Sequence, residues 1–400
     1  MTKMFLLTPL ALFAGAVGAA PLPAWQALDA PALFALRNPA ATAAQRIRVD
    51  GQALRTADRL TLALPGGHRH AIDVVARELR ADGDLWLLGR LDGEATAQVS
   101  LSLSGGHLGG LVSAPEGNYE ITSAPDGSQV VVALDQDAFP ECATNEFDRV
   151  GNAPADVPRQ PFADPPSRTD VLIVFSPQAH AALGSTMAQT KAFAQSMVDS
   201  SNTAFRNSDM TTRFRLAGVR VTARNEAGNS GDDLTWVGND AEVAGWRNDV
   251  AADLVSMVTE TMSDACGRGY LQGSPGPGFA ASAYQVTARG CAVGNLSYVH
   301  EHGHNMGMGH DPGNGNGAYA YSFGHFVSGS FRTVMAYSTN CTGGCTRRPY
   351  FSNPAVNYGG APTGVANERD NHRTGNETAN FTANFRASEI IFLDGFQPAI

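Results

Sequence analysis

The chain has 400 residues and a formal net charge of −10, and it contains no run of basic residues. This charge balance argues against nucleic acid as a partner, because binding to phosphates requires a basic surface. A membrane-spanning protein is also disfavoured, since no stretch reaches the roughly 18 uninterrupted apolar residues that indicate a transmembrane helix.

Residues 1–20 have the composition of an export signal. Lys3 gives a positive start, residues 4–17 are almost wholly apolar, and residues 18–20 are small, as a signal peptidase site requires. A buried N-terminal helix is the alternative. We therefore expect a secreted or periplasmic protein whose mature part, about 380 residues, is long enough for two domains.

Residues 21–136 are rich in short segments that indicate strands. Apolar runs at 60–64, 85–88 and 130–134 are separated by turn sequences such as the proline and glycines at 65–67. No constellation of acid and base groups is recognisable in this part. We expect a mostly β N-terminal domain.

Residues 137–168 change character, because six prolines interrupt any regular element. Such a composition is typical of a linker that lies over a surface or is exposed to proteases. Arg159 and Arg168 offer trypsin-like cleavage points. We expect maturation at or between them, which would separate residues 21–136 from a domain that begins near Thr169.

The part from 169 to 400 has the alternating pattern of an α/β domain, beginning with a continuous apolar run that is typical of a buried strand. The expected elements are a strand at 171–175, a helix at 185–207, a strand at 212–222 with a bulge at 217–218, a helix at 240–253 and a strand at 254–258. This order predicts an α/β layer that precedes a helix with a histidine motif.

That motif contains His300 and His304, one helical turn apart, so both imidazoles leave the same helix face and can bind one metal ion. Gly307 permits the left-handed backbone that ends a helix, and His310 then supplies a third ligand. Three neutral imidazoles leave one tetrahedral position of a zinc ion open for water, as in catalytic sites. Glu301 lies beside that position. Histidines on a helix without a metal are the alternative.

The motif resembles the zinc-binding signature H-E-x-x-H-x-x-G-x-x-H of the metzincin metallopeptidases and matches it at every specified position. The resemblance implies a methionine turn beneath the zinc, and Met335 lies 25 residues after His310. Met335 and Tyr337 form a Met-x-Tyr turn similar to that of astacins and serralysins, in which the tyrosine bonds to the developing oxyanion. Asp311 resembles the bacterial reprolysin-like branch instead. Core packing remains the alternative for Met335 and Tyr337.

The resemblance implies an α/β (α+β) metzincin-like catalytic domain at 169–400 and a mostly β N-terminal propeptide domain, whose residues 106–121 resemble other propeptides. It also implies that a strand at 282–286 is an edge strand that pairs with an extended peptide substrate. An edge that binds nothing is the alternative. Residues 349–354 and 376–381 resemble a closing strand and a C-terminal helix.

Five cysteines are present, and disulfides are expected in an exported chain. We expect Cys266 to pair with Cys291 and Cys341 with Cys345, one of the three pairings that four cysteines allow. Cys142 is then left over in the linker. A thiolate binds zinc better than water does, so Cys142 is a possible latency ligand that fills the open position until the linker is cut. A buried or unused thiol is the alternative.

The sequence thus predicts a secreted zinc-dependent endopeptidase, made as a latent precursor, with Glu301 as general base and Tyr337 as oxyanion donor. The expected cofactor is one Zn²⁺ ion held by His300, His304 and His310, which would lower the pKa of its bound water from about 15.7 to about 7. The expected partner is an extended peptide or protein substrate, and the protein is expected to be a monomer. The alternatives are a zinc hydrolase of a non-peptide amide or ester and a non-catalytic extracellular binding module. The presence of Glu301 disfavours the latter.

Two segments carry weaker expectations. The run 311–317 has oxygen ligands but no recognised spacing for calcium, so a calcium site is unsupported. The apolar tail at 390–396 is expected to pack as a last strand. Neither the physiological substrate nor the cleavage preference follows from the sequence.

Overall fold

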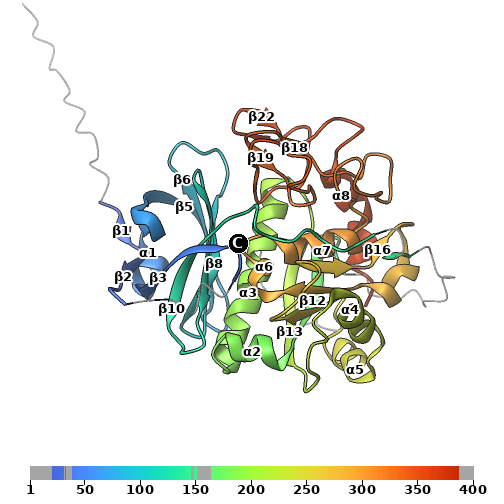
Figure 1. Cartoon of the computed structure of the whole chain (residues 1–400), viewed down its shortest axis with the longest axis horizontal. Coiled ribbons are helices and arrows are strands. Elements are labelled where there is room, and N and C mark those ends of the chain that lie inside the picture. Colours follow the sequence, from blue (N-terminus) through green and yellow to red (C-terminus); the bar gives the residue numbers. More distant parts are fainter. Residues whose placement is uncertain (1–19, 31, 33–37, 146–147, 151–163, 387–400) are drawn as a thin grey trace, which may run out of the picture.

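In the computed structural model, one long helix lies between two β-sheets (Figure 1). The structure describes residues 20–30, 32, 38–145, 148–150 and 164–386. Residues 1–19 of the expected signal peptide, Arg159 and the apolar tail therefore lie outside the described residues. Within the described part, no helix has both the length and the apolar character needed to cross a bilayer.

The N-terminal part forms a ten-stranded sheet in the order β1-β4-β5-β6-β7-β8-β9-β10-β3-β2. Only the β1–β4 pair is parallel among these described strands. The strands are β1 (Leu22–Pro23), β2 (Trp25–Ala27), β3 (Ala41–Val49), β4 (Arg59–Ala63), β5 (Arg69–Leu79), β6 (Leu85–Leu91), β7 (Val99–Ser104), β8 (His107–Ala114), β9 (Gly117–Ser123) and β10 (Gln129–Leu134), with helix α1 (Gly51–Thr56) between β3 and β4. The apolar runs expected as strands at 60–64, 85–88 and 130–134 are confirmed as β4, β6 and β10.

Both faces of this sheet are buried around β7. Leu101 on one face belongs to the apolar core of the N-terminal part, whereas Ser102 on the other face is fully buried against the central helix α3 (Met187–Asn207). The turn from β7 to β8 consists of Gly105 and Gly106, with φ of 54° and 85°, the left-handed values that a two-residue hairpin loop requires. The sheet therefore packs against α3 as well as on its own core.

The second sheet has five strands in the order β13-β12-β14-β17-β15, and all neighbours are parallel except β15 and β17. The strands are β12 (Arg168–Phe175), β13 (Arg213–Val221), β14 (Leu254–Thr259), β15 (Gly267–Gly269) and β17 (Tyr284–Ala288). Alternate residues of β12 enter two different cores: Ile173 packs with α3 and the histidine helix, and Leu172 packs with two helices on the opposite face. These layers make the mixed sheet and helix arrangement that the sequence predicts.

The helix expected at 240–253 is present but ends earlier, at Asp249, and a second helix that was not expected precedes it. Two helices cover that face, α4 (Ser230–Asn239) and α5 (Ala241–Asp249). Asp240 separates them, because its side chain accepts hydrogen bonds from the backbone N–H groups of Glu242 and Val243 and so caps the start of α5. The bulge in β13 is confirmed, since the pairing register with β12 shifts between Leu216 and Gly218.

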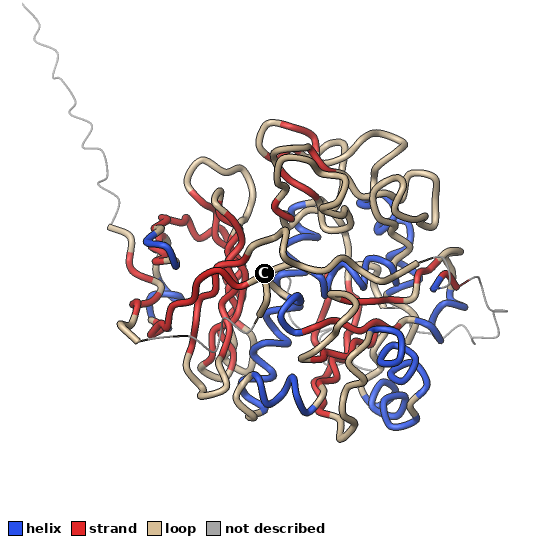
Figure 2. The backbone as a smooth tube through the Cα atoms, in the orientation of Figure 1, coloured by secondary structure: helices blue, strands red, loops and turns tan. Residues whose placement is uncertain are grey.

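A strand is present near 282–286, as β17, but the prediction that it lies at the edge of the sheet is wrong. β17 is an interior strand with β14 on one side and β15 on the other, so the short strand β15 forms that edge of the sheet. Residues 349–354 form no strand, whereas the expected C-terminal helix is present as α8 (Asn371–Thr382). Between the histidine helix and α8 the chain is mostly loops (Figure 2).

The remaining elements are short. They are β11 (Arg149–Val150), β16 (Leu271–Gln272), β18 (Phe326–Val327), β19 (Phe331–Arg332), β20 (Thr346–Arg347), β21 (Asn357–Tyr358), β22 (Ala361–Pro362), α2 (Pro177–Ala182), α6 (Arg289–Ala292), α7 (Ser297–Asn305) and the 3-10 helices η2 (Pro65–Gly67) and η4 (Pro277–Ser282).

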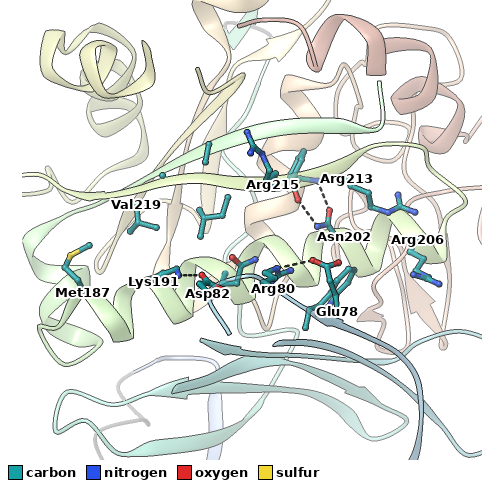
Figure 3. Close-up of a pocket in the computed structure, with 16 residues that line it drawn as sticks. Glu78, Arg80, Asp82, Met187, Lys191, Asn202, Arg206, Arg213, Arg215 and Val219 are labelled. Carbon is teal, nitrogen blue, oxygen red and sulfur yellow. Dashed lines mark hydrogen bonds and ion pairs between the residues drawn. The ribbon is translucent and has the colours of Figure 1, made fainter. Parts of the chain in front are cut away.

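The polar face of α3 is buried by the N-terminal sheet instead of facing solvent. Asp199, fully buried, accepts hydrogen bonds from Arg80 at 2.7 and 3.1 Å and from Ser102 at 2.7 Å. Next to this contact between α3 and the N-terminal sheet lies a cleft of about 750 Å³. It is bounded by the β5–β6 hairpin, α3 and β13, and Lys191 forms an ion pair with Asp82 in it (Figure 3). No residue of the histidine motif lines this cleft.

Candidate metal centre

Helix α7 places two of the motif's histidines on one face. His300 and His304 are fully buried, and their ring centroids lie 5.0 Å apart. The helix ends at Asn305, and Gly307 then adopts φ +84°, which lets the chain turn back toward the same face. His310 comes from this returning segment, and its ring centroid lies 4.6 Å from that of His304. The three rings therefore converge.

The hydrogen bonds of the rings determine which nitrogen of each is free. Nδ1 of His300 lies 2.8 Å from the carbonyl oxygen of Val334. Nδ1 of His304 and Nδ1 of His310 each lie 2.9 Å from a carbonyl oxygen, that of Met308 and that of Asn314 respectively. A carbonyl oxygen only accepts, so each Nδ1 carries the hydrogen and each Nε2 keeps a lone pair. Burial lowers the pKa of all three imidazoles, which favours this neutral form.

Cys142 joins these histidines. Its Sγ lies 3.6 Å from Nε2 of His304, and one ligand atom from each of the four residues lies within 4.8 Å of the others. Three imidazole nitrogens and one sulfur are a donor set typical of zinc. The residues present therefore fit a zinc ion, on the evidence of their free lone pairs and their convergence.

Glu301 lies beside the four donors. Its Oε2 accepts a hydrogen bond from the Cys142 thiol at 3.2 Å, and its Oε1 is buried without a hydrogen-bond partner among the described residues. Burial raises the pKa of this carboxyl to about 8. Gly267 of β15 makes the close approach possible, because a Cβ atom there would lie 2.7 Å from Cγ of Glu301.

Tyr337 packs over the third histidine, with ring centroids 4.1 Å apart. Its hydroxyl donates a hydrogen bond to the carbonyl oxygen of Cys142 at 2.8 Å. Burial raises the pKa of this phenol well above its usual value, so the hydroxyl stays a donor. The side chain expected to contact an oxyanion therefore already contacts a carbonyl oxygen next to the histidine cluster.

Asp311 joins the segment of the third histidine to that of Tyr337. Its Oδ1 accepts from the backbone N–H of Tyr337 at 2.8 Å, and its Oδ2 accepts from the side chains of Asn314 and Asn340. Asp311 is the one carboxylate in the run 311–317. Because both of its oxygens are engaged, this run presents no free carboxylate to calcium.

Met335 is fully buried beneath α7. A Cβ atom at Gly303, which lies between the two helical histidines, would come within 2.5 Å of Sδ of Met335. The methionine therefore supports the segment that carries the ligands without belonging to the ligand cluster.

The linker runs through the site in the same direction as β15 and β16. Ala143 N–H donates to Gly267 O at 2.9 Å, and β11 pairs in parallel with β16. The Thr144 hydroxyl lies 3.4 Å from Oε2 of Glu301 and accepts from Gly269 N–H at 2.9 Å. Sequence reasoning missed Thr144 and the strand β15 with its two glycines, because no local pattern shows that the linker reaches β15.

The expected disulfides are present: Cys266 is bonded to Cys291, and Cys341 to Cys345. Cys142 has a free thiol. Arg168, one of the two expected processing points, is the first residue of β12, and its side chain forms ion pairs with Asp164 and Asp170.

A helix-borne histidine pair, a third histidine after a glycine turn and an adjacent glutamate define a zinc-hydrolase type of site on this α/β fold. Residues 166–352 match the family model Reprolysin_5, described as metallo-peptidase family M12. The region that contains the site is accordingly similar to metzincin-like zinc metallopeptidases.

Curated relatives agree with this assignment. The peptidyl-Asp metalloendopeptidase of Stenotrophomonas maltophilia is 30% identical over 270 residues, covering 64% of this chain and 61% of the relative. That of Xanthomonas campestris is 29% identical over 362 residues, covering 84% of each chain. The chain thus spans about three fifths of the first relative's length. Superposition on metalloproteinase-II from Bacteroides fragilis gives a TM-score of 0.44 at 10% identity, over 80% of this chain and 90% of that one.

Proposed function

We propose that this protein is a secreted zinc-dependent endopeptidase that is made as a latent precursor. The observation that carries the proposal is the convergence of three imidazole Nε2 atoms, each with a free lone pair, beside the carboxyl group of Glu301. The relatives are named metalloendopeptidases, which supports the same reaction. Their name also specifies aspartate, and we extend to this chain a preference for an acidic residue at the cleaved bond.

His300, His304 and His310 would hold the zinc ion through Nε2. Bound zinc supplies Lewis acidity, which polarises a carbonyl group and lowers the pKa of a water molecule. Glu301 would accept the proton of the attacking water at Oε1, the atom without a hydrogen-bond partner, and deliver it to the departing amine. The departing amine needs this proton, because an amine anion is a poor leaving group.

Tyr337 would donate its hydroxyl hydrogen to the oxygen of the scissile carbonyl. Its present bond to the carbonyl of Cys142 supports this role, because that carbonyl lies at the cluster as a substrate carbonyl would. One such donor is worth about 3 kcal/mol of transition-state stabilisation. Met335 would serve as the methionine turn of the family by fixing α7 from below.

Latency would come from the linker. Cys142 supplies the fourth donor of the cluster and so would fill the position that water needs for attack. Backbone hydrogen bonds would keep Cys142 at the cluster, because its carbonyl oxygen accepts from Tyr337 and the N–H of Ala143 donates to Gly267. Cleavage of the linker at or between Arg159 and Arg168 would release residues 21–136, as a propeptide domain, from a catalytic domain that begins near residue 169. Export follows from the signal-like segment at 1–20 and is consistent with the two disulfides.

Hydrolysis assays with the Glu301→Gln variant test the reaction class. The full chain is expressed for export and processed, and casein and a peptide library are then incubated with it, with and without a chelator. We expect cleavage by the parent, none with the chelator, and a loss of several orders of magnitude for Glu301→Gln. Cleavage that survives Glu301→Gln contradicts the mechanism. Hydrolysis of esters or small amides without peptides favours a non-peptide hydrolase, and zinc binding without any hydrolysis favours a binding module.

A further inference from the structure

Glu141, the residue before Cys142, has its carboxylate in a polar pocket of the catalytic region. Its Oε1 accepts hydrogen bonds from the backbone N–H of Ser338, at 2.6 Å, and from the Ser338 hydroxyl. Two guanidinium groups lie on its other sides, Arg332 at 3.8 Å and Arg347 at 3.7 Å. Oε1 thus faces the Ser338 donors and Arg332, and Oε2 faces Arg347.

Both arginines are buried almost completely, with side-chain exposures of 1% for Arg332 and 3% for Arg347. Among the described residues, Glu141 is the only carboxylate within 4.0 Å of either one. Burial and the charge of Arg347 lower the pKa of Arg332 to about 9. Two buried like charges need an anion between them, and here that anion is supplied by the linker.

Backbone carbonyl oxygens also hold the two arginines in place. Arg347 donates to the carbonyl oxygens of Asn295 and Ala336, at 3.0 and 3.3 Å. Arg332 donates to the carbonyl oxygen of Cys345, within a disulfide-closed loop. These bonds belong to the catalytic region and do not depend on Glu141, although Arg332 also donates to the carbonyl oxygen of Gln136 in the N-terminal part, at 3.3 Å. Removal of the linker would therefore leave a preformed cationic pocket with no counterion.

The position of the pocket relates it to the reacting bond. Cys142 faces the histidine cluster, and Glu141 is its direct neighbour, bound to the sheet edge by a hydrogen bond from Cys266 N–H to its carbonyl oxygen at 3.2 Å. A substrate peptide that takes the linker's place along β15 would have one residue at the metal, where Cys142 now lies. The side chain of the preceding residue would then enter this pocket, as that of Glu141 does.

We propose that Arg332, Arg347 and Ser338 form the subsite that recognises an acidic side chain next to the cleaved bond, and that Glu141 fills this subsite in the precursor. The inference rests on the proposed function and names the residues that give it specificity. A purely structural role for the arginines predicts no affinity for a free carboxylate, so binding experiments separate the two.

The first test measures binding and needs no catalysis. The full-length Glu141→Ala variant, with zinc present, is titrated with N-acetyl-aspartate amide and with N-acetyl-asparagine amide while thermal unfolding is followed. We expect the aspartate probe at several times its Kd to raise the Tm by a few degrees, and the asparagine probe to leave it unchanged. Neither probe should shift the parent or the control Glu368→Ala, in which Glu141 is present. Equal shifts from both probes, or none from either, overturn the subsite.

The second test measures specificity in the processed enzyme. Two fluorogenic peptides differ only in Asp or Asn next to the cleaved bond, and kcat/KM is measured for the parent and for Ser338→Ala. We expect kcat/KM of the parent to be at least tenfold higher for the Asp peptide than for the Asn peptide. In Ser338→Ala this Asp-to-Asn ratio should fall about tenfold, because the variant loses a hydrogen bond to a charged group. The control Ser263→Ala, whose hydroxyl donates to Gly228 O, should keep the parent's ratio.

The outcomes distinguish the two proposals. Cleavage of both peptides at equal rates overturns the subsite and leaves the endopeptidase intact. No cleavage of either peptide, together with selective binding of the aspartate probe, overturns the proposed function and leaves the carboxylate pocket standing.

Discussion

Nε2 of His300 and Nε2 of His310 lie 3.2 Å apart, and both carry lone pairs because the Nδ1 atom of each ring faces a carbonyl oxygen. Two acceptors at this distance repel each other unless a cation or a proton lies between them. Burial disfavours the protonated imidazole and lowers the pKa of both rings. A metal ion is therefore the species that satisfies this pair.

Metal removal should destabilise the folded chain. We expect the chelator-treated precursor to unfold at a lower temperature than the zinc-loaded one, because zinc binds the converged ligands only in the folded state. The difference should approach about 4 kcal/mol when free zinc exceeds its Kd about 1,000-fold. Differential scanning calorimetry with metal analysis measures it. His310→Ala should remove most of the zinc effect, and His372→Ala, outside the cluster, should keep it. Equal stability with and without chelator contradicts the site.

Replacing Cys142 should activate the precursor. Cys142→Ala removes the sulfur donor of the cluster, so water can take that position. The linker also loses its contacts with Glu301 and His304, so substrate can displace it more readily. We expect the unprocessed variant to cleave a peptide at least about tenfold faster than the unprocessed parent. Ser128→Ala, in an exposed turn of the N-terminal sheet, is the control. Chain length is checked by mass spectrometry, and a Cys142→Ala precursor as inactive as the parent would end the latency proposal.

The sequence predicted the elements whose signals are local. The histidine spacing and Gly307 describe a helix that stops, and the structure shows α7 ending at Asn305 with Gly307 in the left-handed conformation. The apolar run at 171–175 and the helix at 185–207 were predicted for the same reason: each signal lies within one short segment of the chain.

Contacts between distant segments were not predictable in this way. β17 was expected to be an edge strand, but β15, a three-residue strand with two glycines, pairs with its outer side. Three residues with two glycines carry no strand signal. Glu141 likewise follows a proline in the linker, and its partners Arg332 and Arg347 come about 200 residues later. Charge alone does not reveal such a pairing.

Gly303→Ala should weaken the metal site although it adds a better helix former to α7. Alanine gains about 1 kcal/mol over glycine in a helix interior. Its methyl group would lie 2.5 Å from Sδ of Met335, and overpacking of a buried site costs about 1 to 3 kcal/mol. We expect a net loss of stability and weaker zinc affinity, measured by chemical denaturation and metal competition. Gly245→Ala in α5 is the matched control, because nothing lies within 4 Å of its added Cβ, and it should stabilise the chain. A stabilised Gly303→Ala variant would contradict the tight packing.

Glu120 should make the precursor less stable as the pH rises. It lies on β9 of the N-terminal sheet and accepts a hydrogen bond at 3.0 Å from the backbone N–H of Gly294, just before α7. Burial raises its pKa from 4.5 to about 7, an effect that the charge of Arg289 opposes and that of Glu260 reinforces. Because the folded chain prefers the protonated acid, this contribution is fully present below about pH 4.5 and is lost as the pH rises through about 7.

The Glu120→Gln variant isolates this effect, since glutamine keeps the acceptor for Gly294 N–H but does not ionise. We expect the parent to lose on the order of 3 kcal/mol of unfolding free energy relative to Glu120→Gln between acidic and neutral pH. Urea denaturation of both full-length chains at each pH measures the difference, and titrations that both chains share cancel. Since the bond joins the N-terminal sheet to the segment that leads into the histidine helix, the same loss would loosen the sheet from that segment at neutral pH. Parallel stability curves for the two chains would show instead that Glu120 is solvated and does not hold this contact.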